Sequence, residues 1–322
     1  MKALVQTAYG DAAQLELRDV PVPEPREGEV RVRVRAASVN RADWLIVTGE
    51  PLIARLAFGL PRPKRVIRGQ ELSGVVDAIG PGVRHLAVGD AVFGEIAGGA
   101  FAEFVCAPEA SLVAKPSGVT FEQAACLALA GGTALQGVEL AGLRAGQSIL
   151  INGASGGVGT FAIQLARSLG AEVTAVCSAS NLEQATALGA ARVIDYGLRD
   201  ATAGPERYDV ILDLAGNHRL AHLRRALAPR GTLVLASGNG SRLLGPLGAI
   251  LRASIVNLFV AQRLVALAAS PKRAVLERLA ALVQEGVLSP VIERVLPLAD
   301  SASAVALVGA GHASGKTVIT VP

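Results

Sequence analysis

The stretch I-L-I-N-G-A-S-G-G-V-G, residues 149–159, joins a short apolar run to three evenly spaced glycines. The run has the length and composition of a buried parallel strand, and a helical apolar pattern follows the glycines. Gly153, Gly156 and Gly159 permit a sharp turn and let backbone N–H groups approach a pyrophosphate at the start of a helix. Their spacing is G-x-x-G-x-x-G rather than G-x-G-x-x-G, so the prediction of a dinucleotide site depends on the strand and helix around them.

The chain after this stretch alternates apolar strands with helical patterns, which is typical of a doubly wound parallel α/β sheet. The predicted strands are residues 148–151, 172–177, 192–195, 208–212 and 232–236, with another near 291–295. We expect the turn residues to hold the cofactor's pyrophosphate; they are Ala154, Ser155, Gly156, Gly157 and Val158. The alternative is an ordinary glycine-rich turn in an enzyme that binds no nucleotide.

The first third of the chain has a β pattern instead. Residues 29–35 alternate valine with charged residues, which predicts a half-buried antiparallel strand. We expect a partly open β-barrel over residues 1–118, and a strand-like tail that returns to its sheet. The predicted domains are therefore 1–118 completed by 290–322, and a nucleotide-binding domain over 119–289.

Composition restricts the class of protein and its surroundings. A chain of 322 residues with 51% hydrophobic residues and 36 glycines suits two densely packed α/β domains. The net charge is only +4 and the basic residues are dispersed, so no nucleic-acid partner is expected. Cys106, Cys126 and Cys177 have no paired spacing and the amino terminus lacks a signal-peptide core, which favours the cytoplasm.

Several stretches along the chain match a single family in order and spacing. They are S-V-N-R-A-D-W from Ser38, A-F-A-E-F-V from Ala100, L-A-G-G-T-A-L-Q from Leu129, G-A-S-G-G-V-G from Gly153, L-G-A-A-R-V-I-D-Y from Leu188 and G-H-A-S-G-K-T-V-I-T-V from Gly311. The chain resembles the zinc-independent quinone oxidoreductases of the medium-chain dehydrogenase/reductase superfamily. The resemblance implies a GroES-like catalytic domain, a Rossmann domain, an NADPH cofactor and, usually, a homodimer. It also implies reduction of quinones or α,β-unsaturated carbonyls, small lipophilic substrates.

No metal site is expected. The zinc branch of the superfamily uses a cysteine in an early turn and a histidine in a G-H-E stretch, where this chain has Asn40 and Gln70. His218 and His222 are four residues apart and could share a helix face, but no third ligand lies nearby in sequence. A surface helix is the simpler interpretation of that pair.

Without a metal ion, the substrate must itself accept hydride readily, as quinones and enones do. Asn40 and Thr133 are the candidate donors to the developing enolate, and by resemblance both border the nicotinamide and substrate. The alternatives are that Asn40 only satisfies a turn and that Thr133 only caps the helix beginning at Ala134. Asp43 is a further candidate, more as a helix cap or orienting group than as a general acid.

The cofactor is expected to be NADPH, with NADH possible. The strand 172–177 is followed by no carboxylate that would repel a 2′-phosphate, and Ser178 and Asn181 can donate to it. Relatives often carry arginine where this chain has Ser180 and Ser314, so the preference is expected to be weaker. By resemblance Tyr196 and Lys316 approach the same end of the cofactor, and the strand 232–236 leads to the nicotinamide end. The expected contacts outside the glycine turn are Ser178, Asn181, Tyr196, Lys316, Ser237 and Gly238.

The apolar segment 243–269 is interrupted by Arg252 and Arg263, so it is not expected to span a membrane. We expect dimer or core packing first, a pocket wall second, and membrane contact last, because no basic amphipathic face is evident.

The function expected from these features is NADPH-dependent quinone or enone reduction. One alternative is a cofactor-binding structural or interaction protein with little turnover. Another is an enoyl reductase acting on a carrier-bound chain, which would need a basic docking surface.

Overall fold

The computed structural model describes residues 1–236, 242–311 and 313–322, which form two compact units. The first unit comprises residues 1–132 and 271–322, and the second comprises residues 133–270.

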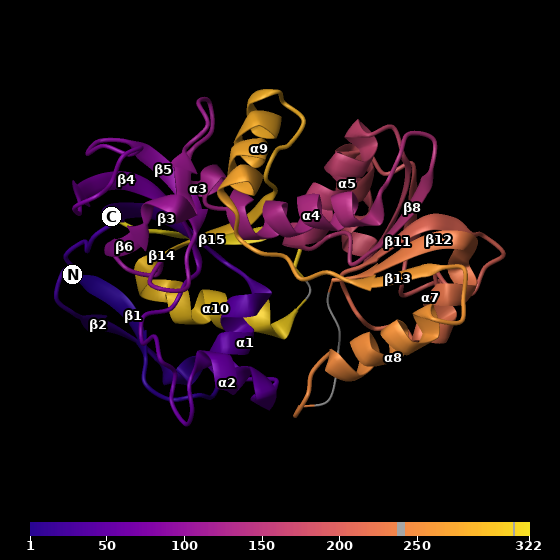
Figure 1. Ribbon diagram of the computed structural model, residues 1–322, viewed down its shortest axis with the longest axis horizontal. Helices are drawn as coiled ribbons and strands as arrows, with labels where there is room; N and C mark the ends of the chain where they lie inside the picture. The colour runs from indigo at the N-terminus through magenta and orange to yellow at the C-terminus, as the bar shows by residue number, and fades with distance from the viewer. Residues whose placement is uncertain (237–241, 312) are drawn as a thin grey trace. The chain divides into compact units, whose positions relative to one another are not determined.

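The second unit is built on a six-stranded parallel sheet in the order β10-β9-β8-β11-β12-β13. Figure 1 labels β8, β11, β12 and β13 of this sheet. Its strands are β8 (Ser148–Asn152), β9 (Glu172–Cys177), β10 (Arg192–Asp195), β11 (Tyr208–Asp213), β12 (Leu227–Leu235) and β13 (Arg263–Ala266). Its helices are α4 (Gly132–Ala141), α5 (Gly157–Ser168), α6 (Leu182–Leu188), α7 (Leu220–Ala226) and α8 (Leu247–Asn257). The strand order reverses between β8 and β11, which is the topology of a Rossmann fold.

The central strands of this sheet are apolar throughout because both of its faces are covered. Ile149, Ile151 and Ile211 are completely buried. The predicted strands 148–151, 172–177, 192–195, 208–212 and 232–236 are therefore confirmed.

One predicted strand of this sheet is wrong. The strand near 291–295 exists as β14 (Ile292–Pro297), but it pairs with β15 (Lys316–Thr320) in the first unit. The sixth strand of the Rossmann sheet is β13 instead. It is a short run inside the apolar segment 243–269, where length and periodicity do not separate a strand from a helix.

The first unit holds a seven-stranded sheet in the order β14-β15-β3-β4-β5-β7, with β6 also paired to β3, and a separate pair β1-β2. The remaining strands are β1 (Lys2–Gln6), β2 (Leu15–Asp19), β3 (Glu29–Val39), β4 (Glu71–Ile79), β5 (Ala91–Glu95), β6 (Phe104–Pro108) and β7 (Leu112–Ala114). Its helices are α1 (Arg41–Thr48), α2 (Arg55–Phe58), α3 (Phe121–Ala124), α9 (Arg273–Gln284) and α10 (Ser301–Ala310).

Strand β3 organises this unit. Val30, Val32 and Val34 are completely buried while Arg33 and Arg35 are exposed, as the alternating pattern predicts. The tail strand β15 pairs antiparallel with β3, which confirms that the end of the chain returns to this sheet.

The two units divide at different residues from the predicted domains. The predicted boundaries at 118/119 and 289/290 compare with 132/133 and 270/271 in the structure. Helix α9 accounts for the second difference, because it packs against β7 and Arg273 donates to the Leu112 carbonyl at 3.2 Å. These contacts attach α9 to the first unit.

Among the described residues, the helical run Phe121–Ala141 is long and apolar enough to cross a membrane. Because 72% of its most apolar window is buried inside the protein, it has the character of a core helix.

Candidate active site

The glycine turn after β8 is shaped by two different requirements. Gly153 has φ +89°, which favours glycine, and a Cβ added to Gly159 would lie 2.4 Å from the Gly153 carbonyl oxygen. Gly159 is therefore needed for close packing of the turn. Gly156 differs, because its φ of −71° suits any residue and the nearest atom to an added Cβ is 3.7 Å away. The fold itself does not require a glycine there, so the open space is available to a ligand.

Helix α5 begins at this turn and offers an anion site. Gly156 is its N-cap, no side chain caps the helix, and its first turn carries no acidic residue. The first N–H groups of a helix lack partners within it and carry partial positive charge, which suits a pyrophosphate. The structure places the predicted turn residues together here; they are Ala154, Ser155, Gly156, Gly157 and Val158.

The residues predicted for the adenosine end also come together, at the carboxyl ends of β9 and β10. The Tyr196 amide donates to the Cys177 carbonyl at 3.1 Å, and the Tyr196 side chain is 53% exposed. Asn181 is buried and its Nδ2 donates to Ser178 Oγ at 2.9 Å. Asn181 therefore orients Ser178, and Ser178 and Tyr196 are the more accessible of the three.

A buried polar pair marks the point where the strand order reverses. Asn152 is the last residue of β8 and Asp213 the last residue of β11. Asn152 Nδ2 donates to Asp213 Oδ1 at 2.7 Å and to the side-chain oxygen Oδ1 of Asn217 at 2.8 Å. Burial raises the pKa of Asp213. This pair was not among the predicted site residues, although a polar residue directly follows each of the two predicted apolar strands. Ligands bind at such reversal points in open α/β sheets.

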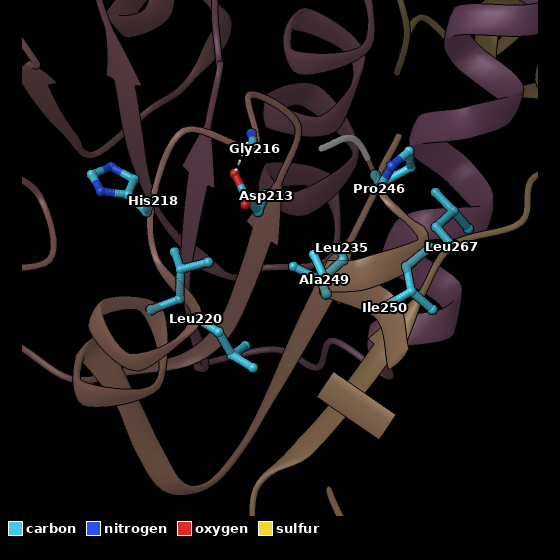
Figure 2. Close-up of a pocket in the computed structure, with 11 residues that line it drawn as sticks. Asp213, Gly216, His218, Leu220, Leu235, Pro246, Ala249, Ile250 and Leu267 are labelled. Carbon is cyan, nitrogen blue, oxygen red and sulfur yellow. Dashed lines mark hydrogen bonds between the residues drawn. The ribbon is translucent and has the colours of Figure 1, made fainter. Parts of the chain in front are cut away.

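A small apolar cavity adjoins Asp213 (Figure 2). Its volume is about 150 Å³, and its walls include Leu220, Leu235, Ile250 and Leu267. A cavity of roughly this size accepts a molecule such as benzene. Ile250 and Leu267 belong to the segment 243–269. The expectation that this segment forms a pocket wall is therefore correct for part of it.

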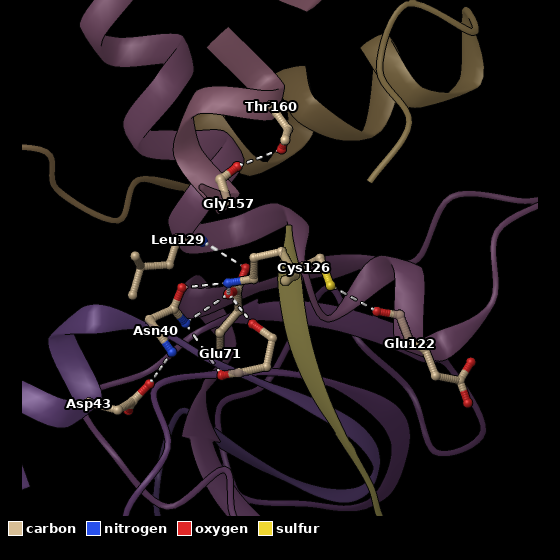
Figure 3. A network of polar contacts seen from close by, with 10 residues as sticks. Asn40, Asp43, Glu71, Glu122, Cys126, Leu129, Gly157 and Thr160 are labelled. Carbon is tan, nitrogen blue, oxygen red and sulfur yellow. Dashed lines mark hydrogen bonds and ion pairs between the residues drawn. The ribbon is translucent and has the colours of Figure 1, made fainter. Parts of the chain in front are cut away.

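The first unit contains a buried polar cluster centred on Glu71, which is completely buried (Figure 3). Glu71 Oε2 accepts from Ser38 Oγ at 2.5 Å, from Asn40 Nδ2 at 3.0 Å and from Lys316 Nζ at 3.0 Å. Its other oxygen, Oε1, accepts from the Leu129 amide at 2.9 Å. Glu71 was not among the predicted site residues, although it stands beside Gln70 in the G-Q-E stretch.

Asn40 is fully engaged within this cluster. Its Nδ2 donates to Glu71 and to the Ser38 carbonyl, and its Oδ1 accepts from Lys316 Nζ at 2.5 Å. No donor of the Asn40 side chain is left for an enolate, so the hypothesis that it donates to substrate is wrong in this structure. The N-cap of α1 is Asn40 and not Asp43; Asp43 is the third residue of the helix, and its carboxylate accepts from the Asn40 backbone N–H at 2.8 Å. Burial raises the pKa of Asp43 to about 7.

Comparisons with known proteins agree with this architecture. Residues 26–117 match the alcohol dehydrogenase GroES-like domain, and residues 188–319 match the zinc-binding dehydrogenase family. The chloroplast envelope quinone oxidoreductase homolog of Arabidopsis thaliana is 34% identical, over 99% of this chain and 98% of that protein. The chain belongs to the zinc-independent quinone oxidoreductase branch of the medium-chain dehydrogenase/reductase superfamily. The predicted family and its GroES-like and Rossmann architecture are thereby confirmed.

Two further relatives of this branch extend the comparison. The quinone oxidoreductase structure from Coxiella burnetii has a TM-score of 0.88 at 30% identity, covering 100% of this chain and 99% of that one. The chloroplastic NADPH-dependent alkenal/one oxidoreductase of Arabidopsis thaliana is 30% identical, over 99% of this chain and 79% of that protein. The family fold binds a nicotinamide dinucleotide.

The family's zinc position is occupied here by groups that do not suit zinc. The oxygens of Asn40 and Glu71 bind the Lys316 ammonium, whose charge repels a second cation. Gln70 replaces the histidine of the zinc branch, and its buried Oε1 has no hydrogen-bond partner in the described part of the chain. Among residues 1–236, 242–311 and 313–322, no three histidine, cysteine or acidic side chains are placed to hold a metal ion.

The prediction that Lys316 contacts the cofactor's phosphate end is wrong. Its side chain is 3% exposed and forms an ion pair with Glu71. Strand β15 is buried from Lys316 to Ile319, and two oxygen partners hold the Lys316 ammonium group in the core of the first unit.

Thr133 is the second residue of α4, and Gly132 alone separates it from the π-helical segment Leu127–Gly131. Because the helix runs continuously into α4, Thr133 is not the cap of a helix that starts at Ala134. Short π-helical segments are frequent at functional sites. The role of Thr133 toward the cofactor stays a prediction, and Ser237 and Gly238 lie outside the described residues.

Glu95 makes the stability of the first unit depend on pH. It pairs with Glu71 across β4 and β5, and burial together with the Glu71 charge raises its pKa to about 7. The folded protein therefore holds the proton more tightly than the unfolded chain, and stability falls as pH rises from about 4.5 to 7. Glutamine carries no charge at any pH, so Glu95→Gln does not lose this stability. We expect its free energy of unfolding, relative to that of the parent, to rise by about 1–3 kcal/mol when the pH is raised from about 5 to about 8.

Urea denaturation at the two pH values measures this gain. Glu277→Gln, on the exposed face of α9, is the matched control and should show no pH-dependent gain. A constant difference between Glu95→Gln and the parent across this range would contradict the assignment.

Proposed function

We propose that this protein transfers hydride from NADPH to small lipophilic quinones or α,β-unsaturated carbonyls. The observation that carries the proposal is the open position at Gly156, at the uncapped start of α5, where the fold leaves room for a pyrophosphate. The names of its relatives, quinone oxidoreductase and NADPH-dependent alkenal/one oxidoreductase, support the same reaction class.

The chain's own residues contribute positioning and exclusion of water. The turn 154–158 holds the pyrophosphate, Ser178 and Tyr196 hold the adenosine end, and the apolar walls beside Asp213 exclude water. NADPH, when bound, supplies a hydride. The acceptor gains this hydride and one proton from water, and its own carbonyl oxygen delocalises the added charge. Thr133 is our candidate donor to that oxygen, while Glu71 and Lys316 fix Asn40.

A panel of acceptors tests this function. NADPH oxidation is followed with 1,4-benzoquinone, 9,10-phenanthrenequinone and 2-hexenal, and turnover is expected with at least one of them. If NADPH binds but none of the three is reduced, the alternative of a cofactor-binding protein with little turnover is favoured instead.

The cofactor preference is expected to respond to one exposed residue, Ser180. An arginine there can form charge-assisted, bidentate contacts with a 2′-phosphate that serine cannot form. We expect Ser180→Arg to bind NADPH roughly 10-fold more tightly and NADH with unchanged affinity, by titration calorimetry. Ser180→Gln controls for side-chain size. Equal tightening of both cofactors would contradict a 2′-phosphate site.

Cytoplasmic location and a homodimer remain part of the proposal. The three cysteines, Cys106, Cys126 and Cys177, are unpaired, which suits a reducing compartment.

A further inference from the structure

Arg68 is a buried cation without a partner in the first unit. Only 5% of its surface is accessible. Its side chain forms no hydrogen bond or ion pair with any residue in the ranges 1–236, 242–311 and 313–322. A buried guanidinium normally has oxygen partners for its N–H groups, because burying a charge without them is costly. The described part of the chain supplies none to Arg68.

The donor end of Arg68 is accessible from outside the unit. Nε is completely buried and has no hydrogen-bond partner, whereas the two terminal nitrogens also lack a partner among the described residues but are not completely buried. The small accessible fraction of the residue therefore includes the outer edge of the guanidinium. That edge presents two parallel N–H groups in one plane, which is the arrangement that pairs with the two oxygens of a carboxylate.

Three backbone hydrogen bonds fix the position of Arg68. Its amide donates to the Leu4 carbonyl at 3.1 Å, and its own carbonyl accepts from the amides of Gly99 at 3.3 Å and Phe101 at 2.9 Å. A charged group on a fixed backbone loses less freedom when a ligand binds. Arg68 is therefore well placed to hold an anion.

Asp43 is a carboxylate whose charge acts on Arg68, but it is not its partner. Asp43 Oδ2 accepts from the Asn40 amide at 2.8 Å, as Figure 3 shows, and no ion pair joins Asp43 to Arg68. Burial raises the pKa of Asp43 to about 7, so part of the Asp43 population is neutral near neutral pH. Burial also lowers the pKa of Arg68, as expected for a cation whose charge is not compensated.

Arg68 ends a basic stretch of the chain. No acidic residue occurs between positions 50 and 71, where the basic residues are Arg55, Arg62, Lys64, Arg65 and Arg68. None of them forms an ion pair in the described part of the chain. Tyr9 and Arg65 are both close enough to Arg68 to influence its charge, and the Arg55 guanidinium lies 4.3 Å from the centre of the Tyr9 ring. This excess of positive charge attracts anions to the region of Arg68.

We propose that Arg68 binds the carboxylate of an acceptor that is both an enone and a carboxylic acid. The inference rests on the proposed function and narrows its substrate class to α,β-unsaturated carbonyls that carry a carboxylate. Hydride from NADPH forms a C–H bond at the β carbon, a proton from water adds at the α carbon, and the C=C double bond becomes single while NADPH becomes NADP⁺. The carboxylate is unchanged and only positions the molecule. A planar carboxylate also fits a narrow opening better than a tetrahedral phosphate does.

Thermal unfolding in the presence of a saturated product tests the binding without turnover. The full chain is heated with 4-oxopentanoate, with its methyl ester or with inorganic phosphate, all at one concentration. We expect only 4-oxopentanoate to raise the unfolding temperature of the parent, because a ligand that binds the folded state stabilises it. Arg68→Met should abolish the increase, and Arg68→Lys should keep part of it, since lysine retains the charge but not the planar fork. Arg26→Gln is the control, because Arg26 is exposed in the same unit outside the basic stretch, and it should behave as the parent does.

Stability without ligand separates a binding role from a structural one. Arg68→Met removes a buried charge that has no partner, so it should unfold at the same temperature as the parent or at a higher one. A lower unfolding temperature would show that Arg68 supports the fold, and would overturn the proposal. The proposal is also overturned if 4-oxopentanoate does not stabilise the parent, or if the ester or phosphate stabilises it equally well.

Turnover provides the second measurement, as kcat/KM with NADPH for trans-4-oxo-2-pentenoate and for its methyl ester. The parent should favour the acid by at least about 10-fold, the effect of hydrogen bonds to a charged group, and Arg68→Met should remove this preference. Equal reduction of acid and ester by the parent would contradict the role of Arg68 and leave the proposed function intact. Reduction of neither compound, nor of any acceptor in the panel, would contradict the proposed function, and the thermal measurement would still decide whether Arg68 binds a carboxylate.

Discussion

Gly156→Asp is expected to weaken NADPH binding by at least about 100-fold while the protein stays folded. The φ of −71° at Gly156 suits aspartate, and an added Cβ has no neighbour closer than 3.7 Å. Aspartate is also a favourable N-cap, so helix α5 is retained. The new carboxylate would occupy the space that we assign to the pyrophosphate and would repel it. Titration calorimetry measures the affinity, and thermal unfolding should shift by only a few degrees.

The matched control is Gly156→Ser, which caps the helix without adding charge. It should retain more affinity for NADPH than the aspartate variant does. If Gly156→Asp binds NADPH as tightly as the parent, the pyrophosphate does not lie at this turn.

Glu71→Ala is expected to lower the free energy of unfolding by about 3–5 kcal/mol. Glu71 accepts four hydrogen bonds in the core of the first unit, and its removal takes away the carboxylate that pairs with the buried Lys316 ammonium, which then keeps a hydrogen bond to the neutral Asn40 amide. Breaking one partner of a buried ion pair costs much more than breaking a surface pair. Urea denaturation near neutral pH measures the loss.

Two controls separate this effect from a general loss of packing. Glu277→Ala removes the exposed partner of Arg273 and should cost about 0.5 kcal/mol or less. Glu71→Leu combined with Lys316→Met removes both charges and should be more stable than Glu71→Ala. If the double variant is no more stable than Glu71→Ala, the buried charge is not the cause.

The parts of the fold that were predictable depend on local sequence. Strand β8, the glycine turn and α5 follow one another directly, so a single stretch specifies all three. Strand β13 was not predictable in the same way, because four residues inside an apolar segment carry no distinct period. The placement of β14 depends on its pairing with β15, a contact that no local pattern reveals.

The candidate site likewise has one part that local sequence predicts and another that depends on contacts between distant strands. The turn residues and Ser178 follow the strands that position them, so the sequence alone predicts where in the fold they lie. The Glu71 cluster depends on β4 and β15, and 245 residues separate Glu71 from Lys316. Family resemblance placed Lys316 near the cofactor, but the contacts of its amine with Asn40 and Glu71 in the folded unit show that it lies in the core.

Isotope transfer from the cofactor tests the central claim, direct hydride delivery to an activated acceptor. The protein is incubated with NADPH deuterated on both positions of the nicotinamide C4, together with 2-hexenal, and the product is analysed by mass spectrometry. The account predicts hexanal with one deuterium at the carbon beta to the carbonyl, in amounts equal to the NADPH consumed. Consumption of NADPH without deuterium in the product, or no reaction with this or the quinone acceptors, would contradict it.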